Sequence, residues 1–390
     1  MNSIDSEVSK GIAEGVIHGA VLQAGTAHED FFAKAWGYAD AESRTEMGID
    51  TVIDLASVTK VLATTSALAI CRDRGLVDLD AAFTCYLPDY SAAMPKPITV
   101  RELATHTSGF GQQCHYDDAD GHDIRRNMLA TPPSGAHGKF EYSCWNFQLL
   151  GMLLEEVTGC LLPEFCRTQI FEPLGMRDSS LGAPLPALPV TRLAQTYATD
   201  RPGQISDFIA FRLYRDGLTA GNAGAFSSAP DLATFCRCLL QDGEYGYGKR
   251  MFSPESLADM STPYIQDSSV RRGMGWIVAD ELKPPGFSDR TIYHSGWSGQ
   301  TVFLDLDQQF YAVVLTVRSE EYERARRGRF RLIGELGRLF RASEAGEREA
   351  KRELGELSAN ETDIPEPGDT SVPGNGSAGS EPHRDQPRAH

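Results

Sequence analysis

The sequence predicts an α/β fold of the α+β type, with an antiparallel sheet flanked by helices. The sheet is formed by both chain ends and surrounds a mainly helical insert. Three observations support this: strand-like runs lie near both ends, helical periodicity dominates the middle, and an amphipathic helix follows the last strands. The chain of 390 residues is 41% hydrophobic and 23% charged, which is ordinary for a soluble globular protein. Its length predicts two or three domains.

The two chain ends carry the strand signals. Runs rich in β-forming residues cover 20–24, 31–36, 301–305 and 311–317. A helix is expected over 4–17. Another is expected over 320–341, where apolar residues recur at near-helical spacing and arginines lie on the other face. We therefore expect both ends to share one sheet, with the second helix covering it.

Helix signals dominate the middle of the chain. Apolar side chains recur at helical intervals over 58–74, and Gly75 follows at a position that favours a helix end. Residues 145–158 are apolar on nearly every face, which predicts a buried helix ended by Gly159. The middle is therefore expected to be a helical insert in a sheet-bearing domain.

The composition divides the chain into three expected parts. A discontinuous sheet-containing domain comprises residues 1–60 and 285–341, and residues 61–284 form the mainly helical insert. Residues 343–390 are dominated by Glu, Ser, Gly and Pro, and they contain too little apolar surface to offset the entropy cost of ordering. We expect this last segment to be a disordered acidic tail.

Charge and cysteine usage exclude several classes of function. The net charge is −17 and no long Lys/Arg run occurs, so neither nucleic acid nor an anionic membrane is an expected partner. No targeting signal is recognisable, and no run reaches about 18 apolar residues, so we expect a cytoplasmic protein. The eight cysteines include no CxxC pair, which predicts neither a zinc site nor a disulfide framework.

Ser57 and Lys60 are the first candidates for chemistry. They stand three residues apart at the start of the helix expected over 58–74, directly after the strand-like run 52–55. This spacing places both side chains on one helix face. A serine nucleophile needs a partner that takes its proton, and a partly buried lysine with a lowered pKa can serve. Taken alone, such a pair is more often a capping serine beside a surface lysine.

Two further elements follow in the chain. Tyr142 stands in Tyr142-Ser143-Cys144, at the mouth of the buried helix, where a tyrosine is more often a core ring. The segment His294-Ser295-Gly296 follows a strand-like run, and Gly296 permits close backbone approach. Each element by itself is more often structural than catalytic.

Together and in this order, the three elements resemble the penicillin-recognising serine hydrolases, which include serine β-lactamases, DD-peptidases and related esterases. The resemblance runs from about residue 5 to residue 341 and points most to the branch of class C β-lactamases and their esterase relatives. It implies a β-lactamase-like fold. Further matching segments are 103–109, 149–159, 173–176 and 221–228.

The resemblance implies a role for each matching residue. Ser57 is expected to be the acylated nucleophile, Lys60 its proton partner, and Tyr142 the shuttle that carries the proton to the leaving group. The expected substrate-binding residues line the cleft and are Cys144, His294, Ser295, Gly296 and Trp297. By the same resemblance, the backbone N–H groups of Ser57 and Trp297 form the oxyanion hole.

Cys144 departs from the family pattern. The family often has Tyr-x-Asn, whose amide contacts the lysine and the acylamide of the substrate, whereas this chain has a thiol at that position. Asn146 comes two residues later and is expected to point elsewhere. We interpret Cys144 as a small packing residue rather than a second nucleophile.

No cofactor or metal is expected. The loop 114–123 gathers His, Cys and Asp side chains, but it lacks the full spacing of an EF-hand and no HExxH occurs. We interpret the loop as a polar rim of the cleft. His106 is expected to be structural and to satisfy a turn.

The sequence thus predicts a metal-free serine hydrolase that forms an acyl-enzyme on Ser57 with a small-molecule acyl substrate. Loss of the amide at position 144 favours a carboxylic ester. The alternatives are a β-lactamase or a peptidase/amidase on the same acyl-enzyme route, an acyltransferase, and a catalytically silent binding protein of the same fold. The natural acyl group and the oligomeric state stay open.

Overall fold

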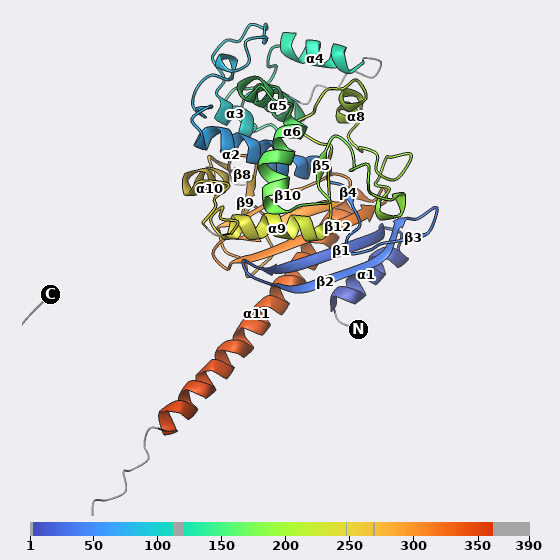
Figure 1. Ribbon diagram of the computed structural model, residues 1–390, viewed down its shortest axis with the longest axis vertical. Coiled ribbons are helices and arrows are strands. Elements are labelled where there is room, and N and C mark those ends of the chain that lie inside the picture. The colour runs from blue at the N-terminus through green and yellow to red at the C-terminus, as the bar shows by residue number, and fades with distance from the viewer. Residues whose placement is uncertain (1–2, 112–119, 247, 268–269, 362–390) are drawn as a thin grey trace, which may run out of the picture. The chain divides into compact units, whose positions relative to one another are not determined.

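The computed structural model of the protein describes all residues except 1–2, 112–119, 247, 268–269 and 362–390 (Figure 1). The chain divides into two units, Met1–Arg341 and Ala342–His390. The first unit carries the sheets, the cores and the candidate site described below.

A nine-stranded antiparallel sheet forms the base of the first unit. In sheet order its strands are β3 (Thr45–Glu46), β2 (Asp30–Asp40), β1 (Ile17–Thr26), β12 (Phe310–Arg318), β11 (Gln300–Asp305), β10 (Thr291–Ser295), β9 (Ile277–Val278), β8 (Val270–Arg272) and β7 (Ile265–Asp267). The first and last strands along the chain, β1 and β12, are direct neighbours. The prediction that both chain ends build one antiparallel sheet is therefore confirmed.

A second, three-stranded sheet lies beside the helical part and consists of β4 (Ile53–Asp54), β6 (Ala225–Ser227) and β5 (Ser180–Leu181). The α-helices are α1 (Ser3–Ala13), α2 (Ser66–Asp73), α3 (Val100–Ala104), α4 (Gly121–Ala130), α5 (Cys144–Thr158), α6 (Leu162–Cys166), α7 (Glu172–Leu174), α8 (Phe208–Arg215), α9 (Ala229–Leu240), α10 (Pro254–Ser261) and α11 (Tyr322–Glu361). Short 3₁₀ turns are η1 (Ala56–Val58), η3 (Phe83–Cys85) and η5 (Val190–Arg192), and π-helical turns are η2 (Lys60–Thr65) and η4 (Arg167–Phe171).

The large sheet separates two hydrophobic cores, because successive side chains of a strand point to opposite faces. In β12, Val313 and Leu315 face the core shared with α9 and the helical part. Ala312 and Val314 face the other core, which α1 and the first turns of α11 cover (Figure 1). Burial of the apolar stripe of α11, including Ile333, holds this helix on the sheet.

Three strands of the large sheet come from a part of the chain that the sequence had assigned to the helical insert. Strands β7, β8 and β9 lie within residues 265–278, so the sheet begins well before residue 285. Each has only two or three residues, which is too short for a two-residue alternation to stand out.

Helix α11 continues past residue 341 to Glu361, so residues 343–361, which were expected to be disordered, are helical. The segment is rich in Glu and also contains Ala, Arg and Leu, all of which are strong helix formers. Residues 362–390 of the expected tail lie outside the described part of the chain. No helix in the described part combines the length and the apolar run that spanning a membrane requires.

Candidate active site

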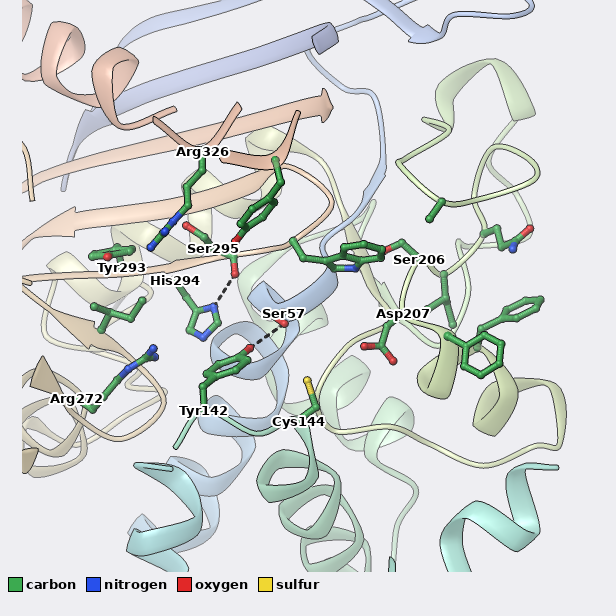
Figure 2. A pocket seen from close by; sticks show the side chains of 18 residues that line it. Ser57, Tyr142, Cys144, Ser206, Asp207, Arg272, Tyr293, His294, Ser295 and Arg326 are labelled. Carbon is green, nitrogen blue, oxygen red and sulfur yellow. Dashed lines mark hydrogen bonds between the residues drawn. The ribbon is translucent and has the colours of Figure 1, made fainter. Parts of the chain in front are cut away.

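A cavity of about 620 Å³ opens between the large sheet and the helical part (Figure 2). Ser57 lies on its wall, with Tyr142 and Cys144 from the start of α5 on one side. Its other lining residues come from the segment around α8, from strands β8 to β10 and from the first turns of α11. Of the residues that the sequence singled out, six line this cavity: Ser57, Tyr142, Cys144, His294, Ser295 and Trp297.

The nucleophile candidate Ser57 stands on a tight turn between β4 and the helix that follows. Ala56, the residue before it, has a φ of 44°, a left-handed conformation that is costly for alanine. The backbone N–H of Leu55, just before the turn, donates to the Ala225 carbonyl at 2.8 Å, and the Asp54 side chain accepts from the Ser206 hydroxyl at 2.5 Å. These bonds hold the chain at the entry to the turn. Strain of this kind persists only where the surrounding structure holds it, and it clusters at functional sites.

Lys60 begins a π-helical turn and reaches back to Ser57. Its ammonium donates to the Ser57 hydroxyl oxygen at 3.0 Å and to the carbonyl of Asn222 at 3.0 Å, and it approaches the Cys144 sulfur at 3.5 Å. The side chain is fully buried. The pairing of Ser57 with Lys60 at i, i+3 is therefore present, with the lysine in the interior rather than on the surface.

The pKa of Lys60 is raised above its ordinary value, whereas the sequence had predicted a lowered one. Burial lowers this pKa, but charge interactions with Cys144, Tyr142 and Asp207 and a hydrogen bond with Tyr142 outweigh it. The lysine is consequently a cation near neutral pH. The expectation failed because the interacting groups come from distant segments that the local sequence does not reveal.

Tyr142 is the second side chain, after Lys60, that donates to the Ser57 oxygen. Its hydroxyl donates to the Ser57 oxygen at 3.0 Å (Figure 2). The ring lies 4.6 Å from the ring of His106, whose Nδ1 accepts from the backbone N–H of Ser143 at 3.2 Å. His106 thus fixes the chain at Tyr142, in keeping with the structural role expected for it. Burial lowers the pKa of His106 well below its usual value, so it is neutral.

The end of β10 approaches the serine turn closely at Gly296. A Cβ at Gly296 would lie 2.5 Å from the Leu55 carbonyl oxygen, 2.7 Å from Gln300 Oε1 and 3.2 Å from the Ala56 Cβ. Only glycine allows this approach, which sets Trp297 beside the serine. Within the described residues, the backbone N–H groups of Ser57 and Trp297 donate to no other group. Both are therefore available to an oxyanion.

His294 and Ser295 form the strand wall of the cavity. Burial lowers the pKa of His294 well below its usual value, so the ring is neutral. Its Nδ1 contacts the Ser295 carbonyl at 3.2 Å, and its buried Nε2 has no partner among the described residues. The Ser295 hydroxyl shares a hydrogen bond of 2.9 Å with Thr301 on β11.

Asn146 does not replace the missing amide at position 144. It is fully buried in α5, where its Oδ1 accepts from the Ser108 hydroxyl at 2.5 Å and its Nδ2 contacts His106. It is not among the cavity-lining residues. The side chain beside Lys60 on this wall is the Cys144 thiol.

Several residues of the site were not predicted from the sequence. The Asn222 carbonyl accepts from Lys60, and Gly221 before it packs so tightly on α5 that a Cβ would lie 2.1 Å from the Phe147 carbonyl oxygen. Gly221 and Gly224 in the sequence were the feature that could have indicated this close packing of the backbone against α5. Asp207 and Arg272 also line the cavity, and no local pattern marked either of them.

No cluster of potential metal ligands occurs in the part of the chain that the structure describes. Most of the loop 114–123 lies outside the described residues. Asp120 is described, and it caps α4 by accepting from the backbone N–H of Asp123 at 2.8 Å.

The family follows from comparison with known proteins. The model of the Beta-lactamase family matches residues 4–335. The chain belongs to this family. The match covers the large sheet, the helical part and all eight residues that the sequence analysis named for the site.

Relatives of this family member carry several functional descriptions. A protein of Escherichia coli K12 described as a putative D-alanyl-D-alanine carboxypeptidase is 26% identical over 332 residues, covering 73% of this chain and 75% of that protein. A class C β-lactamase from Rhodobacter sphaeroides superposes with a TM-score of 0.70 at 21% identity, covering 86% of this chain and 99% of the other. EstCE1, a hydrolase with promiscuous acyltransferase activity, gives a TM-score of 0.68 at 22% identity, covering 85% and 97%. At these identities the two structures show the fold alone.

Proposed function

We propose that this β-lactamase-family protein is a serine hydrolase that forms an acyl-enzyme on Ser57 and hydrolyses carboxylic esters of small molecules. The observation that carries the proposal is the meeting of Lys60 and Tyr142 at one serine oxygen, each at 3.0 Å, on the wall of an open cavity. A serine becomes a nucleophile when a neighbouring group can take its proton. A catalytically silent protein would have no need to bury a lysine at this oxygen.

Acylation needs a proton acceptor, and we assign this role to Lys60 and Tyr142 as a unit. In the structure both groups donate to the Ser57 oxygen, so the reactive form is the one in which this unit has first released one proton to water. The Ser57 proton then passes to this pair as the serine oxygen attacks the carbonyl carbon. When the tetrahedral intermediate collapses, the ester C–O bond breaks and Tyr142 delivers the proton to the leaving oxygen. Water repeats the sequence on the acyl-enzyme and releases the carboxylic acid.

The negative charge of the tetrahedral intermediate needs preorganised donors. The backbone N–H groups of Ser57 and Trp297 serve here, because both are unoccupied within the described residues. The close contact at Gly296 fixes the distance between the two donors.

The acyl side of the cavity favours an apolar acyl group and an ester bond. Beyond Cys144, the wall is formed by Ile205, Phe208 and Phe211, of which Phe208 is 51% exposed. The thiol of Cys144 offers no amide group to an acylamide side chain. A substrate whose amide loses its partner binds more weakly by about 1–3 kcal/mol, so penicillin-type substrates are disfavoured.

Acyl transfer to an alcohol is the second candidate. EstCE1, with the same fold, is described as a hydrolase with promiscuous acyltransferase activity. The same acyl-enzyme serves both outcomes, and the acceptor decides between them. A peptidase or β-lactamase would use this acyl-enzyme as well, but the substitution at position 144 weighs against both.

The test is a series of p-nitrophenyl esters of graded acyl length, measured beside nitrocefin. We expect ester hydrolysis with higher kcat/KM than cephalosporin hydrolysis, and a preference for medium over very short acyl chains. Ser57→Ala should abolish turnover, while the control Ser91→Ala, at an exposed serine, should leave it unchanged. Turnover of nitrocefin without turnover of any ester would refute the proposal.

A further inference from the structure

A second cavity, of about 610 Å³, lies between helices α1 and α11, on the face of the large sheet that these two helices cover (Figure 1). It shares no lining residue with the catalytic cavity. Ion pairs from Arg331 to Glu7 and from Arg324 to Glu14 join its two sides. The cavity is therefore separate from the site described above and is held by contacts of its own.

Arg329 on α11 is the buried cation of this second cavity. It is among the lining residues and is 1% exposed. Its Nε donates to the Thr301 hydroxyl at 3.0 Å, whereas Nη1 and Nη2 have no hydrogen-bond partner among the described residues. Both terminal nitrogens of the guanidinium are therefore free to bind a ligand.

The charge of Arg329 is poorly compensated in the described part of the chain. Glu323 interacts with this charge, but its carboxylate forms an ion pair with Arg326 at 3.8 Å. Burial, together with the charges of Arg318 and Arg326, lowers the pKa of Arg329 to about 10, so the side chain is still a cation near neutral pH. A buried cation without hydrogen bonds or an opposite charge is costly. The position therefore favours an anion as the missing partner.

The rim of the cavity adds positive charge. Five cationic side chains line the cavity against two carboxylates, and both carboxylates are taken up by Arg324 and Arg331. Lys10 on α1 and Arg327 on α11 are exposed, and neither forms an ion pair with a described residue. This excess of cations stands out in a chain whose net charge is −17. It matches a ligand group with two negative charges better than one with a single charge.

The cavity also has an apolar wall and room for more than a small inorganic ion. Its volume of about 610 Å³ is within the range of small-molecule sites. The buried apolar side chains that line it are Val8, Val16, Ile17, Ala325 and Leu332. The ligand that fits this cavity therefore combines an anionic group with an apolar organic group.

We propose that this cavity is a second binding site, for a small organic phosphate monoester whose phosphate group is bound by the free end of Arg329. A phosphate monoester carries about two negative charges at neutral pH, and its oxygens accept paired hydrogen bonds from a guanidinium. Lys10 and Arg327 add charge at the rim, and the organic group lies against the apolar wall. The site goes beyond the proposed function, because binding here involves no residue of the catalytic cavity.

Calorimetry on the full chain tests the site with three probes: 1-naphthyl phosphate, 1-naphthol and inorganic phosphate. The first combines the two groups that the cavity accommodates, and each of the others has only one of them. The variant is Arg329→Met, which removes the buried charge and keeps an unbranched side chain. The matched control is Arg338→Met, at an exposed arginine of α11 that does not line this cavity.

A second variant blocks the cavity without changing Arg329. Gly328 lines the cavity, and a Cβ added there would meet nothing closer than Arg331 Nη2 at 3.8 Å. Gly328→Leu therefore adds a side chain to open space, and leucine favours helix more than glycine does. This variant tests the site even if Arg329→Met does not fold.

We expect the natural sequence to bind 1-naphthyl phosphate at least about ten-fold more tightly than either other probe, and Arg329→Met to weaken this binding by about 10- to 100-fold, as for loss of charge-assisted hydrogen bonds. Gly328→Leu should weaken it as well. Arg338→Met should change it by less than about two-fold, because an exposed arginine contributes little.

Binding of 1-naphthyl phosphate that is unchanged in Arg329→Met or in Gly328→Leu would overturn the assignment. So would the absence of binding to the natural sequence, or equally tight binding of inorganic phosphate or of 1-naphthol. Because calorimetry needs no turnover, these outcomes do not depend on the esterase. Ester hydrolysis without binding of 1-naphthyl phosphate would retain the proposed function and refute the second site.

Discussion

Replacing Gly296 by alanine tests how tightly the strand wall must approach the nucleophile turn. The added Cβ would lie 2.5 Å from the Leu55 carbonyl oxygen, 2.7 Å from Gln300 Oε1 and 3.2 Å from the Ala56 Cβ. Gly296 is not among the positive-φ glycines, so its backbone conformation is open to alanine. The perturbation is therefore purely steric. It acts on the carbonyl of Leu55, which lies two residues before Ser57 in the chain.

The size of the effect follows from these distances. An unstrained contact between a methyl carbon and a carbonyl oxygen needs about 3.2 Å or more, so the strand end and the turn must separate by roughly 0.5–1 Å. Such a displacement moves Trp297 away from the Ser57 N–H and widens the oxyanion hole. Misplacement by about 1 Å at a reacting centre costs up to about 100-fold in rate, and overpacking costs about 1–3 kcal/mol of stability.

Two quantities are measured: kcat for hydrolysis of a p-nitrophenyl ester, and the midpoint temperature of thermal unfolding. We expect Gly296→Ala to lower kcat by about 10- to 100-fold while the protein stays folded at the assay temperature. The control is Gly328→Ala in α11, where an added Cβ would meet nothing closer than Arg331 Nη2 at 3.8 Å. That variant should keep full activity and equal or exceed the natural stability, because alanine favours helix. Natural kcat in Gly296→Ala would refute the reasoning about the oxyanion hole.

Three further predictions concern single side chains. Tyr142→Phe should keep the fold but lower kcat by about 10²- to 10⁴-fold, because only the proton-carrying hydroxyl is removed; natural kcat would make Tyr142 a packing residue. Cys144→Asn should raise kcat/KM for cephalosporins relative to esters by about ten-fold, and no gain would show that the thiol does not set the ester preference. Burial raises the pKa of Asp54 to about 7 from 3.8, so between these values the folded protein holds a proton that the unfolded chain has lost. The contribution of Asp54 to the free energy of unfolding therefore falls as pH rises through this window. Asp54→Asn should make thermal midpoints, measured from about pH 4 to pH 8, fall less steeply with pH than those of the natural sequence. Equal pH profiles of the two proteins would show that Asp54 is ionised throughout.

The sequence predicted those elements of the fold whose residue pattern continues over many positions. The β-rich runs in the β1 and β12 segments, the apolar run over 145–158 and the helical spacing in 320–341 were long enough to identify elements, and the structure has them. Strands β8 and β9 were missed because two or three residues carry no period. Missing these short strands also left a cavity-lining residue unrecognised, since β8 places Arg272 on the cavity wall.

The sequence predicted those parts of the candidate site that a local motif marks. It did not predict the parts that depend on tertiary contacts. Ser57 and Lys60 lie one helical turn apart, so their meeting followed from spacing alone. The charge state of Lys60 did not, because Cys144 and Asp207 reach it from segments far away in the chain. The Asn222 carbonyl that holds Lys60 was equally invisible, since every residue has such a group.

Intact-mass spectrometry after rapid acid quenching tests the acyl-enzyme on Ser57 most directly. A p-nitrophenyl ester, mixed with the protein in excess, should add the mass of one acyl group, and peptide mapping should place it on Ser57. Ser57→Ala should show no adduct, and Lys60→Ala should form it far more slowly, by about three orders of magnitude. An adduct on Ser57→Ala that disappears when Cys144 is also replaced by alanine would contradict the account and make the thiol the nucleophile.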